Sequence, residues 1–391
     1  IGTTSLVAQY VGIGDEEAAK KVARQSLLAV MVVTFILSIA AVILSRRLIE
    51  GMVYFMPEKD LEMIELGASY LSIVSISISL RFSLLVVNAI FQGAGDTRTP
   101  LYLMVLANAV NVVGNYMLIF GHGPFPALGV QGAAIATCAA GMLAGGLGIG
   151  LLFSKFSPLP LNCPLPELFD LKREVLSGVL FVGIPSAVEQ IGVHLGQIFY
   201  TMIVASLGSM AVATQQILHN AYILTYLPGM GFAMTATTLV GQFLGAEKRE
   251  RALKSGMETT RLALTIMSAA GLIFFFFPDA VVGLFSLEEV VRELAVHPLM
   301  VLALAQPALA CIVSLMGGLR GAGDTRWVMY VTLLHMLVLR MAITLILVWL
   351  GMGLVGVWLA MLVESYSRAI FFTYRFRRKI PHIKLLIKSN S

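Results

Sequence analysis

Residues 91–100 read FQGAGDTRTP and residues 319–328 read LRGAGDTRWV, so the hexapeptide GAGDTR occurs twice in a chain of 391 residues. Each copy follows directly on a long apolar stretch. Glycine allows the tight turn that a helix needs to reverse direction at a membrane surface. An aspartate followed by threonine can cap the next helix, and the arginine beside it can anchor at the interface. We expect a hinge-like corner in each copy, formed by Gly93, Gly95, Asp96, Thr97, Gly321, Gly323, Asp324 and Thr325.

A phosphate-binding loop is the other meaning of a glycine-rich turn of this kind. Such a loop requires a strand before the glycines and a helix N-terminus after them. Here an apolar segment of helical length comes first. We therefore interpret both copies as structural corners.

Composition identifies a membrane protein. The chain is 58% hydrophobic and 13% charged, with a mean hydropathy of +0.87, whereas soluble domains carry about 25% charged residues. Apolar runs of about 18 residues or more recur throughout, and strand-like alternation is absent, which predicts an all-α integral membrane protein. The predicted spans are 27–45, 66–92, 101–120, 128–153, 175–206, 209–241, 262–285, 294–320, 327–350 and 354–376.

Lysine and arginine gather in the short loops on one side of these spans, for example at 20–24, 172–173, 248–254 and in the C-terminal tail. Such a bias marks the cytoplasmic side, so both GAGDTR copies are expected there. The net charge of +5 follows from this bias, and no nucleic-acid partner is expected. The cysteines have no metal-ligand spacing, and we expect neither a metal nor a cofactor.

A second repeat accompanies the first. LVAQYVG at 6–12 matches LVGQFLG at 239–245, at nearly the same offset as the two GAGDTR copies. The chain is therefore expected to contain one unit used twice, as two pseudo-symmetric six-helix lobes related as parallel repeats. The first helix and most of the second are expected to be missing from this sequence. We predict an N-terminal lobe at 1–157, a cytoplasmic linker at 158–174 and a C-terminal lobe at 175–391.

With these motifs the sequence resembles the multidrug and toxic compound extrusion (MATE) family. GIPSAVEQ at 183–190, NAVNVVGNYMLIFG at 108–121 and GVWLAMLVESYSRA at 356–369 strengthen the match, which covers essentially the whole chain. The resemblance implies two lobes around a central cavity and export of organic, often cationic, compounds against an inward flow of protons or sodium ions. We expect a monomer in the cell membrane whose substrates are small cationic or amphipathic molecules.

Polar residues inside the spans are costly, so their positions suggest function. Glu189 is expected near mid-membrane, one turn after Pro185, and is a candidate proton carrier and cation ligand. His194 and His219 are secondary candidates. The same two helices carry further polar or aromatic residues at helical spacing, namely Gln190, Gln197, Gln215, Gln216, Asn220, Tyr222 and Tyr226. They line a substrate cavity or, alternatively, only form hydrogen bonds between helices.

A second cluster lies in the last two spans, where Arg340, Glu364 and Arg368 predict a buried charge network or a coupling-ion site. In the first lobe Asn108, Asn111 and Asn115 share a helix face and are further candidates for substrate or ion binding. Arg81 belongs to the predicted buried charges. Its partner is expected to be a carboxylate in the missing first helix. The acidic position that the family carries in its tenth helix is absent here, which leaves the coupling ion open between proton and sodium.

Three other classes are alternatives to an exporter. A major-facilitator transporter would carry its glycine, aspartate and arginine signature after the second helix of each half rather than the fourth. An intramembrane enzyme would need a catalytic motif, and neither HExxH nor GxSxG occurs. A flippase for a lipid-linked oligosaccharide, or for another amphipathic lipid of the same superfamily, is the strongest alternative and would favour an arginine-rich cavity.

Overall fold

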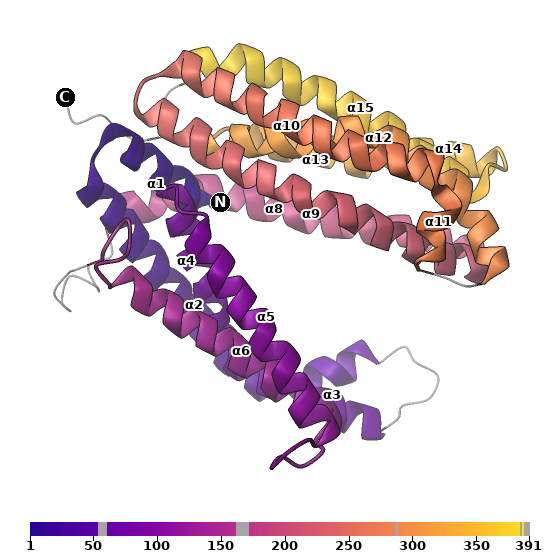
Figure 1. Ribbon diagram of the computed structural model, residues 1–391, viewed down its shortest axis with the longest axis horizontal. Coiled ribbons are helices and arrows are strands. Elements are labelled where there is room, and N and C mark those ends of the chain that lie inside the picture. Colours follow the sequence, from indigo (N-terminus) through magenta and orange to yellow (C-terminus); the bar gives the residue numbers. More distant parts are fainter. Residues whose placement is uncertain (54–60, 162–171, 286–287, 384, 387–391) are drawn as a thin grey trace. The chain divides into compact units, whose positions relative to one another are not determined.

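The computed structural model describes residues 1–53, 61–161, 172–285, 288–383 and 385–386 (Figure 1). All regular structure within these ranges is helical, which confirms the all-α prediction. The helices are α1 (Gly2–Ile13), α2 (Glu16–Met52), α3 (Leu61–Ile76), α4 (Ile78–Gly93), α5 (Arg98–Phe120), α6 (Gly129–Leu152), α8 (Arg173–Ser206), α9 (Ser209–Gly245), α10 (Arg249–Phe276), α11 (Pro278–Gly283), α12 (Glu289–Gly321), α13 (Thr325–Leu333), α14 (Arg340–Trp349) and α15 (Gly353–Lys379). A π-helical turn, Leu334–Leu339, joins α13 to α14.

Nine helices in the described part of the chain are long and apolar enough to cross a membrane, or ten if the bent pair α3 and α4 is one span. The ten predicted spans correspond to these, but several boundaries were wrong. The helix predicted at 262–285 begins at Arg249 and ends at Phe276, before Pro278. Hydropathy detects only the apolar part of a helix, whereas α10 continues through charged turns outside that part. The predicted span 66–92 bends by 49° between α3 and α4.

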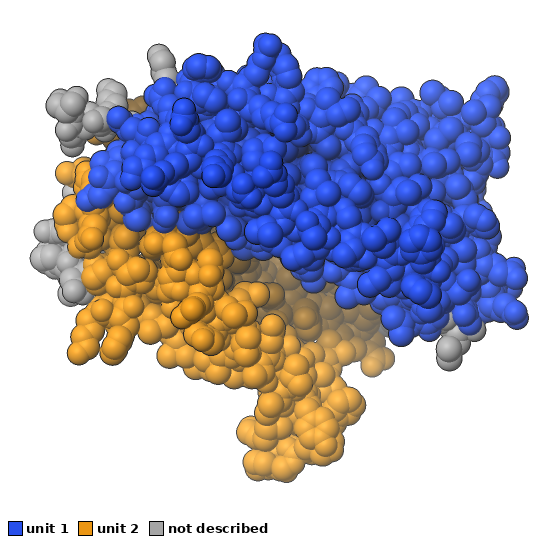
Figure 2. All heavy atoms as spheres, turned by 45° about the horizontal axis from the view of Figure 1, so that its top comes forward, with its two compact units in different colours: residues 1–14, 178–391 blue, residues 15–177 orange. Residues whose placement is uncertain are grey.

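The chain forms two compact units, which we name by their order along the chain: the first unit is residues 15–177, orange in Figure 2, and the second unit is residues 1–14 with 178–391, blue in Figure 2. In the first unit α6 packs against α3, α4 and α5, and α2 packs against α3 and α4. In the second unit α12 is the central helix and packs against α9, α10 and α15. Most of its apolar length is buried, with Leu299, Leu302 and Leu315 at its core. The predicted linker lies largely outside the described residues.

The two copies of the LVxQxxG repeat pack against each other through α1 and α9. A Cβ added at Gly12 of α1 would clash with the backbone carbonyl of Gln242, and one at Gly245 of α9 with that of Gln9. The contact is therefore reciprocal, as expected where two repeats meet at a pseudo-twofold axis. Because of this contact α1 packs with the second unit, whereas the sequence-based division assigns residues 1–14 to the N-terminal lobe.

Both GAGDTR copies form tight corners, but their aspartates have different hydrogen-bond partners. Gly95 and Gly323 have φ values of 94° and 84°, a left-handed backbone conformation that glycine adopts most readily. Asp96 accepts hydrogen bonds from the backbone N–H groups of Arg98 and Thr99 at 2.9 and 3.1 Å, which confirms the predicted cap.

The capping prediction is wrong for the second corner. No side chain caps the start of α13, and Asp324 instead accepts two hydrogen bonds from Arg375 of α15, at 2.8 and 3.3 Å. Arg375 also lies 4.6 Å from the centre of the Trp327 ring. The second corner is thus tied to the C-terminal helix, because a basic side chain is available there to compete for the carboxylate.

Candidate functional site

A cavity of about 410 Å³ lies inside the second unit, among α8, α9, α12, the α13–α14 segment and α15. It brings together residues from both clusters that the sequence singled out. The predicted residues that line it are Glu189, Gln190, His194, Gln197, Gln215, His219, Tyr222, Tyr226, Arg340, Glu364 and Arg368. The two clusters, which we interpreted separately, therefore belong to one site.

Glu189 forms an ion pair with Arg320, whose Nη2 lies 2.9 Å from Oε2. Both side chains are buried, with exposed fractions of 2% and 8%. The hydroxyl of Ser5 on α1 donates to the carbonyl oxygen of Arg320 at 2.8 Å, which fixes the last turn of α12. Sequence analysis missed Arg320. The available signal was an arginine in the last turn of an apolar helix, where the first repeat carries Gln92.

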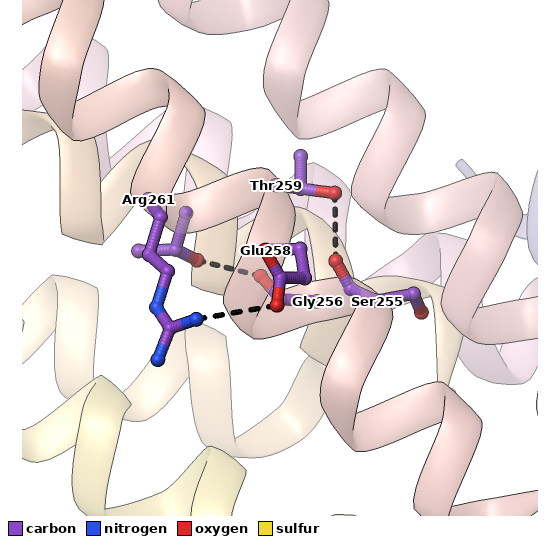
Figure 3. A network of polar contacts seen from close by, with 6 residues as sticks. Ser255, Gly256, Glu258, Thr259 and Arg261 are labelled. Atoms are coloured by element: carbon purple, nitrogen blue, oxygen red, sulfur yellow. Dashed lines mark hydrogen bonds and ion pairs between the residues drawn. The ribbon is translucent and has the colours of Figure 1, made fainter.

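The Arg261–Glu258 pair on α10 illustrates the opposite environment (Figure 3). Its atoms lie 3.2 Å apart, but the two side chains are 72% and 50% exposed. This pair connects one turn of α10 to the next and lines no part of the cavity. It provides an exposed comparison for Glu189 and Arg320.

Aromatic side chains of α9 form one wall. The rings of His219 and Tyr222 stack with centroids 6.2 Å apart, and those of Tyr222 and Tyr226 at 5.3 Å. Gln215, one turn before His219, accepts a hydrogen bond of 3.0 Å from the indole of Trp358 on α15. Trp358 is another cavity residue that sequence analysis missed, because a tryptophan in an apolar span is ordinarily part of the core.

Glu364 and Arg368 form the predicted pair, with Nε and Oε1 3.0 Å apart. Their orientation does not make a hydrogen bond, and both carboxylate oxygens of the fully buried Glu364 have no hydrogen-bond partner. The guanidinium of Arg340 lies 4.3 Å from the centre of the Tyr200 ring. Arg340 directly follows the π-helical turn of the α13–α14 segment.

Other candidates lie elsewhere. Gln216 and Asn220 do not line the cavity, since each follows a lining residue and lies about 100° further around the helix. In the first unit Asn111 donates to Thr137 of α6 at 3.2 Å, and Asn115 donates to Asn111 at 3.1 Å. These bonds connect α5 to α6 and one turn of α5 to the next.

Two further candidates in the first unit are exposed. Asn108 has an exposed side chain and is not part of the hydrogen-bonded pair on its helix. Arg81 is exposed in the described structure, and its aliphatic stem packs beside Gly141, so its place in a buried pair with a carboxylate outside this sequence stays a prediction. The described part of the chain contains no group of three or more His, Cys, Asp or Glu side chains arranged to hold a metal ion.

Charge and polarity define what the cavity can bind. Three arginines and two glutamates line it, so these side chains carry one net positive charge. Several buried polar atoms in its lining have no hydrogen-bond partner, including Nε of Arg320, Arg340 and Arg368. Unsatisfied buried groups are rare in folded proteins and call for an explanation. Here they are concentrated around a space large enough for a small organic molecule.

The MatE family profile matches residues 1–117 and 185–346. The chain belongs to the MatE family. Among its relatives, the probable multidrug resistance protein NorM of Thermotoga maritima is 29% identical over 373 residues, covering 94% of this chain and 78% of that protein. The uncharacterized transporter YisQ of Bacillus subtilis is 26% identical over 387 residues, covering 97% of this chain and 82% of that protein.

Solved structures share the fold of this MatE protein. A multidrug resistance MATE family transporter in an outward-facing conformation superposes with a TM-score of 0.88, at 24% identity over 98% of this chain and 83% of that one. A transporter of the MOP superfamily from Pyrococcus furiosus, described as having a binding pocket of reverse polarity, superposes equally well at 0.88, with 24% identity and the same coverage. As a member of the MatE family, the protein is a multi-pass transporter of the cell membrane, not an enzyme, and needs no cofactor.

Proposed function

We propose that the protein is a secondary active exporter of small amphipathic organic molecules, driven by a proton or sodium gradient. The observation that carries the proposal is the cavity of about 410 Å³ with a buried ion pair at Glu189 and an aromatic wall on α9. Aromatic faces suit the apolar part of a substrate, and a few convergent polar groups orient it. The names of the NorM relatives support multidrug export as the physiological role.

Glu189 is the residue that we propose for ion coupling. A buried carboxylate paired with one arginine has two states, because a bound proton or sodium ion removes or shares the charge that Arg320 otherwise neutralises. We propose that each state favours a different arrangement of α8 and α12, the helices that carry the pair. When Glu189 exchanges Arg320 for a proton or a sodium ion, ion binding would thus be coupled to alternating access between the two lobes of a monomer.

The charge of the cavity bears on the substrate class. With three arginines against two glutamates, the lining does not favour the cationic substrates expected from the family resemblance. Amphipathic substrates agree better with the mixture of aromatic and charged side chains. The same three arginines support a second candidate function, a flippase for an amphipathic lipid with an anionic headgroup.

Everted membrane vesicles provide the test. Uptake of a fluorescent amphipathic compound is followed while a proton gradient or a sodium gradient is imposed separately. We expect one gradient to drive uptake, Glu189→Gln to abolish it, and Glu258→Gln to leave it unchanged, because Glu258 belongs to the exposed pair on α10. If neither gradient drives uptake of any compound while a fluorescent lipid crosses the bilayer, the flippase replaces the exporter.

A further inference from the structure

Not every charged side chain in the cavity has a partner of opposite charge, and the one without a partner points to a class of ligand. Arg320 is paired with Glu189 at 2.9 Å, and Arg368 lies 3.0 Å from Glu364. Arg340 has no carboxylate within 4.0 Å among the described residues. Two of the three arginines are therefore compensated, and the positive charge that remains is located at Arg340.

The surroundings of Arg340 orient its guanidinium. The group lies over the Tyr200 ring, 4.3 Å from its centre, and Tyr200 is itself buried, with an exposed fraction of 2%. The N–H donors of a guanidinium lie in its own plane, where they match the two oxygens of a carboxylate or phosphate. The Nε of Arg340 is buried and has no hydrogen-bond partner.

Hydroxyl groups in the same cavity are also unsatisfied. The buried Oγ of Ser365 and Oγ1 of Thr332 have no partner, and both residues line the cavity with Arg340. Hydroxyl donors beside an arginine are the groups that complete the coordination of an anionic oxygen in proteins. A cation at this place would instead meet an uncompensated positive charge.

We propose that this cavity binds the anionic group of the substrate at Arg340, with the aromatic or apolar part of the substrate against Tyr222 and Tyr226. The transported class is then aromatic or amphipathic molecules that carry a carboxylate or phosphate group. This inference rests on the proposed transport function and specifies its substrate. The anion belongs either to a water-soluble molecule or to a lipid headgroup, and the experiment separates these two sources.

Three pyrene probes of nearly equal size test the charge preference: pyreneacetate, pyrenemethanol and pyrenemethylammonium. Binding to the protein in lipid nanodiscs is measured by energy transfer from tryptophan to pyrene. The chain has three tryptophans, of which Trp358 lines the cavity. Transfer from Trp327 and Trp349 persists in Trp358→Phe, so the transfer that this variant loses is the part between pyrene and Trp358.

We expect pyreneacetate to bind at least about tenfold more tightly than pyrenemethylammonium, with pyrenemethanol between them. In Arg340→Gln the preference for the anion should be lost, and Arg340→Lys should retain part of it. Arg326→Gln is the matched control, since Arg326 also stacks on a ring, that of Phe181 at 4.4 Å, but lies outside the cavity. It should keep the full preference. If Arg340→Gln does not fold, the relative affinities of the three probes for the unmodified protein still test whether the cavity prefers an anion.

Equal affinity for the three probes, or tighter binding of the cation, overturns the inference. Gradient-driven efflux of the cation alone overturns it too and leaves the exporter intact. A preference for the anion without gradient-driven movement of any probe supports the anion site and overturns the exporter. Competition by fluorescent phosphatidylglycerol, but not by phosphatidylcholine, together with its movement across proteoliposomes, assigns the anion to a lipid headgroup.

Discussion

The effect of removing Glu189 or Arg320 on the free energy of unfolding should show whether the two side chains form a buried ion pair. Both side chains are almost fully buried and 2.9 Å apart. Removal of one partner leaves an uncompensated charge, so Glu189→Gln and Arg320→Gln should each lower the free energy of unfolding by about 3–5 kcal/mol. The double variant should lose less than the sum, with a coupling energy of about 2 kcal/mol.

The exposed pair Glu258–Arg261 is the control for this cycle. Its side chains are more than half exposed on average, and a pair of this kind couples by only about 0.3–0.5 kcal/mol. Unfolding of all variants is followed by circular dichroism in mixed detergent micelles of increasing sodium dodecyl sulfate content. If the coupling between Glu189 and Arg320 equals that of the exposed pair, the two residues are not in contact in solution, and the switch proposed at Glu189 is wrong.

Further predictions concern the glycine contact and the two corners. Gly245→Ala should lower the unfolding free energy by about 1–3 kcal/mol, because its Cβ meets the backbone of α1, whereas Gly183→Ala, with no atom nearby, should raise it by up to about 1 kcal/mol. Asp96→Asn should be neutral, since asparagine caps as well as aspartate. Asp324→Asn should cost about 1 kcal/mol through loss of its pair with Arg375. Thermal unfolding in detergent checks each, and equal effects at both aspartates would contradict the distinct roles of the corners.

The fold could be predicted from the sequence because hydropathy and internal repetition are strong, redundant signals. A span of about 20 apolar residues has few alternatives in a membrane. Charged ends of helices give no such signal, which explains the missed beginning of α10 at Arg249. The break after α3 was missed too, because no proline or glycine lies at Ser77, where one helix ends and the next begins.

The site was predictable only in part. The i, i+4 spacing places Gln215 and His219 on one face of α9, and Gln216 and Asn220 on another. Spacing alone does not tell which of these two faces borders the cavity. Arg320 was overlooked because a basic residue at the end of a span is ordinarily an interfacial anchor. Its pairing with Glu189 depends on the packing of α12 beside α8, a long-range arrangement that no local pattern contains.

The two halves of the chain share a backbone plan but not a chemistry. With the GAGDTR copies aligned, Arg320 corresponds to Gln92 and Arg340 to Val112. The five charged side chains of the cavity therefore all come from the second half, and at these aligned positions the first half carries an amide and an apolar residue. Duplication explains the corners and the reciprocal contact of α1 with α9, because backbone geometry requires glycine in both copies. Charge at the cavity is under no such geometric requirement, so it can differ between the halves, and we expect the substrate preference proposed above to depend on the second half.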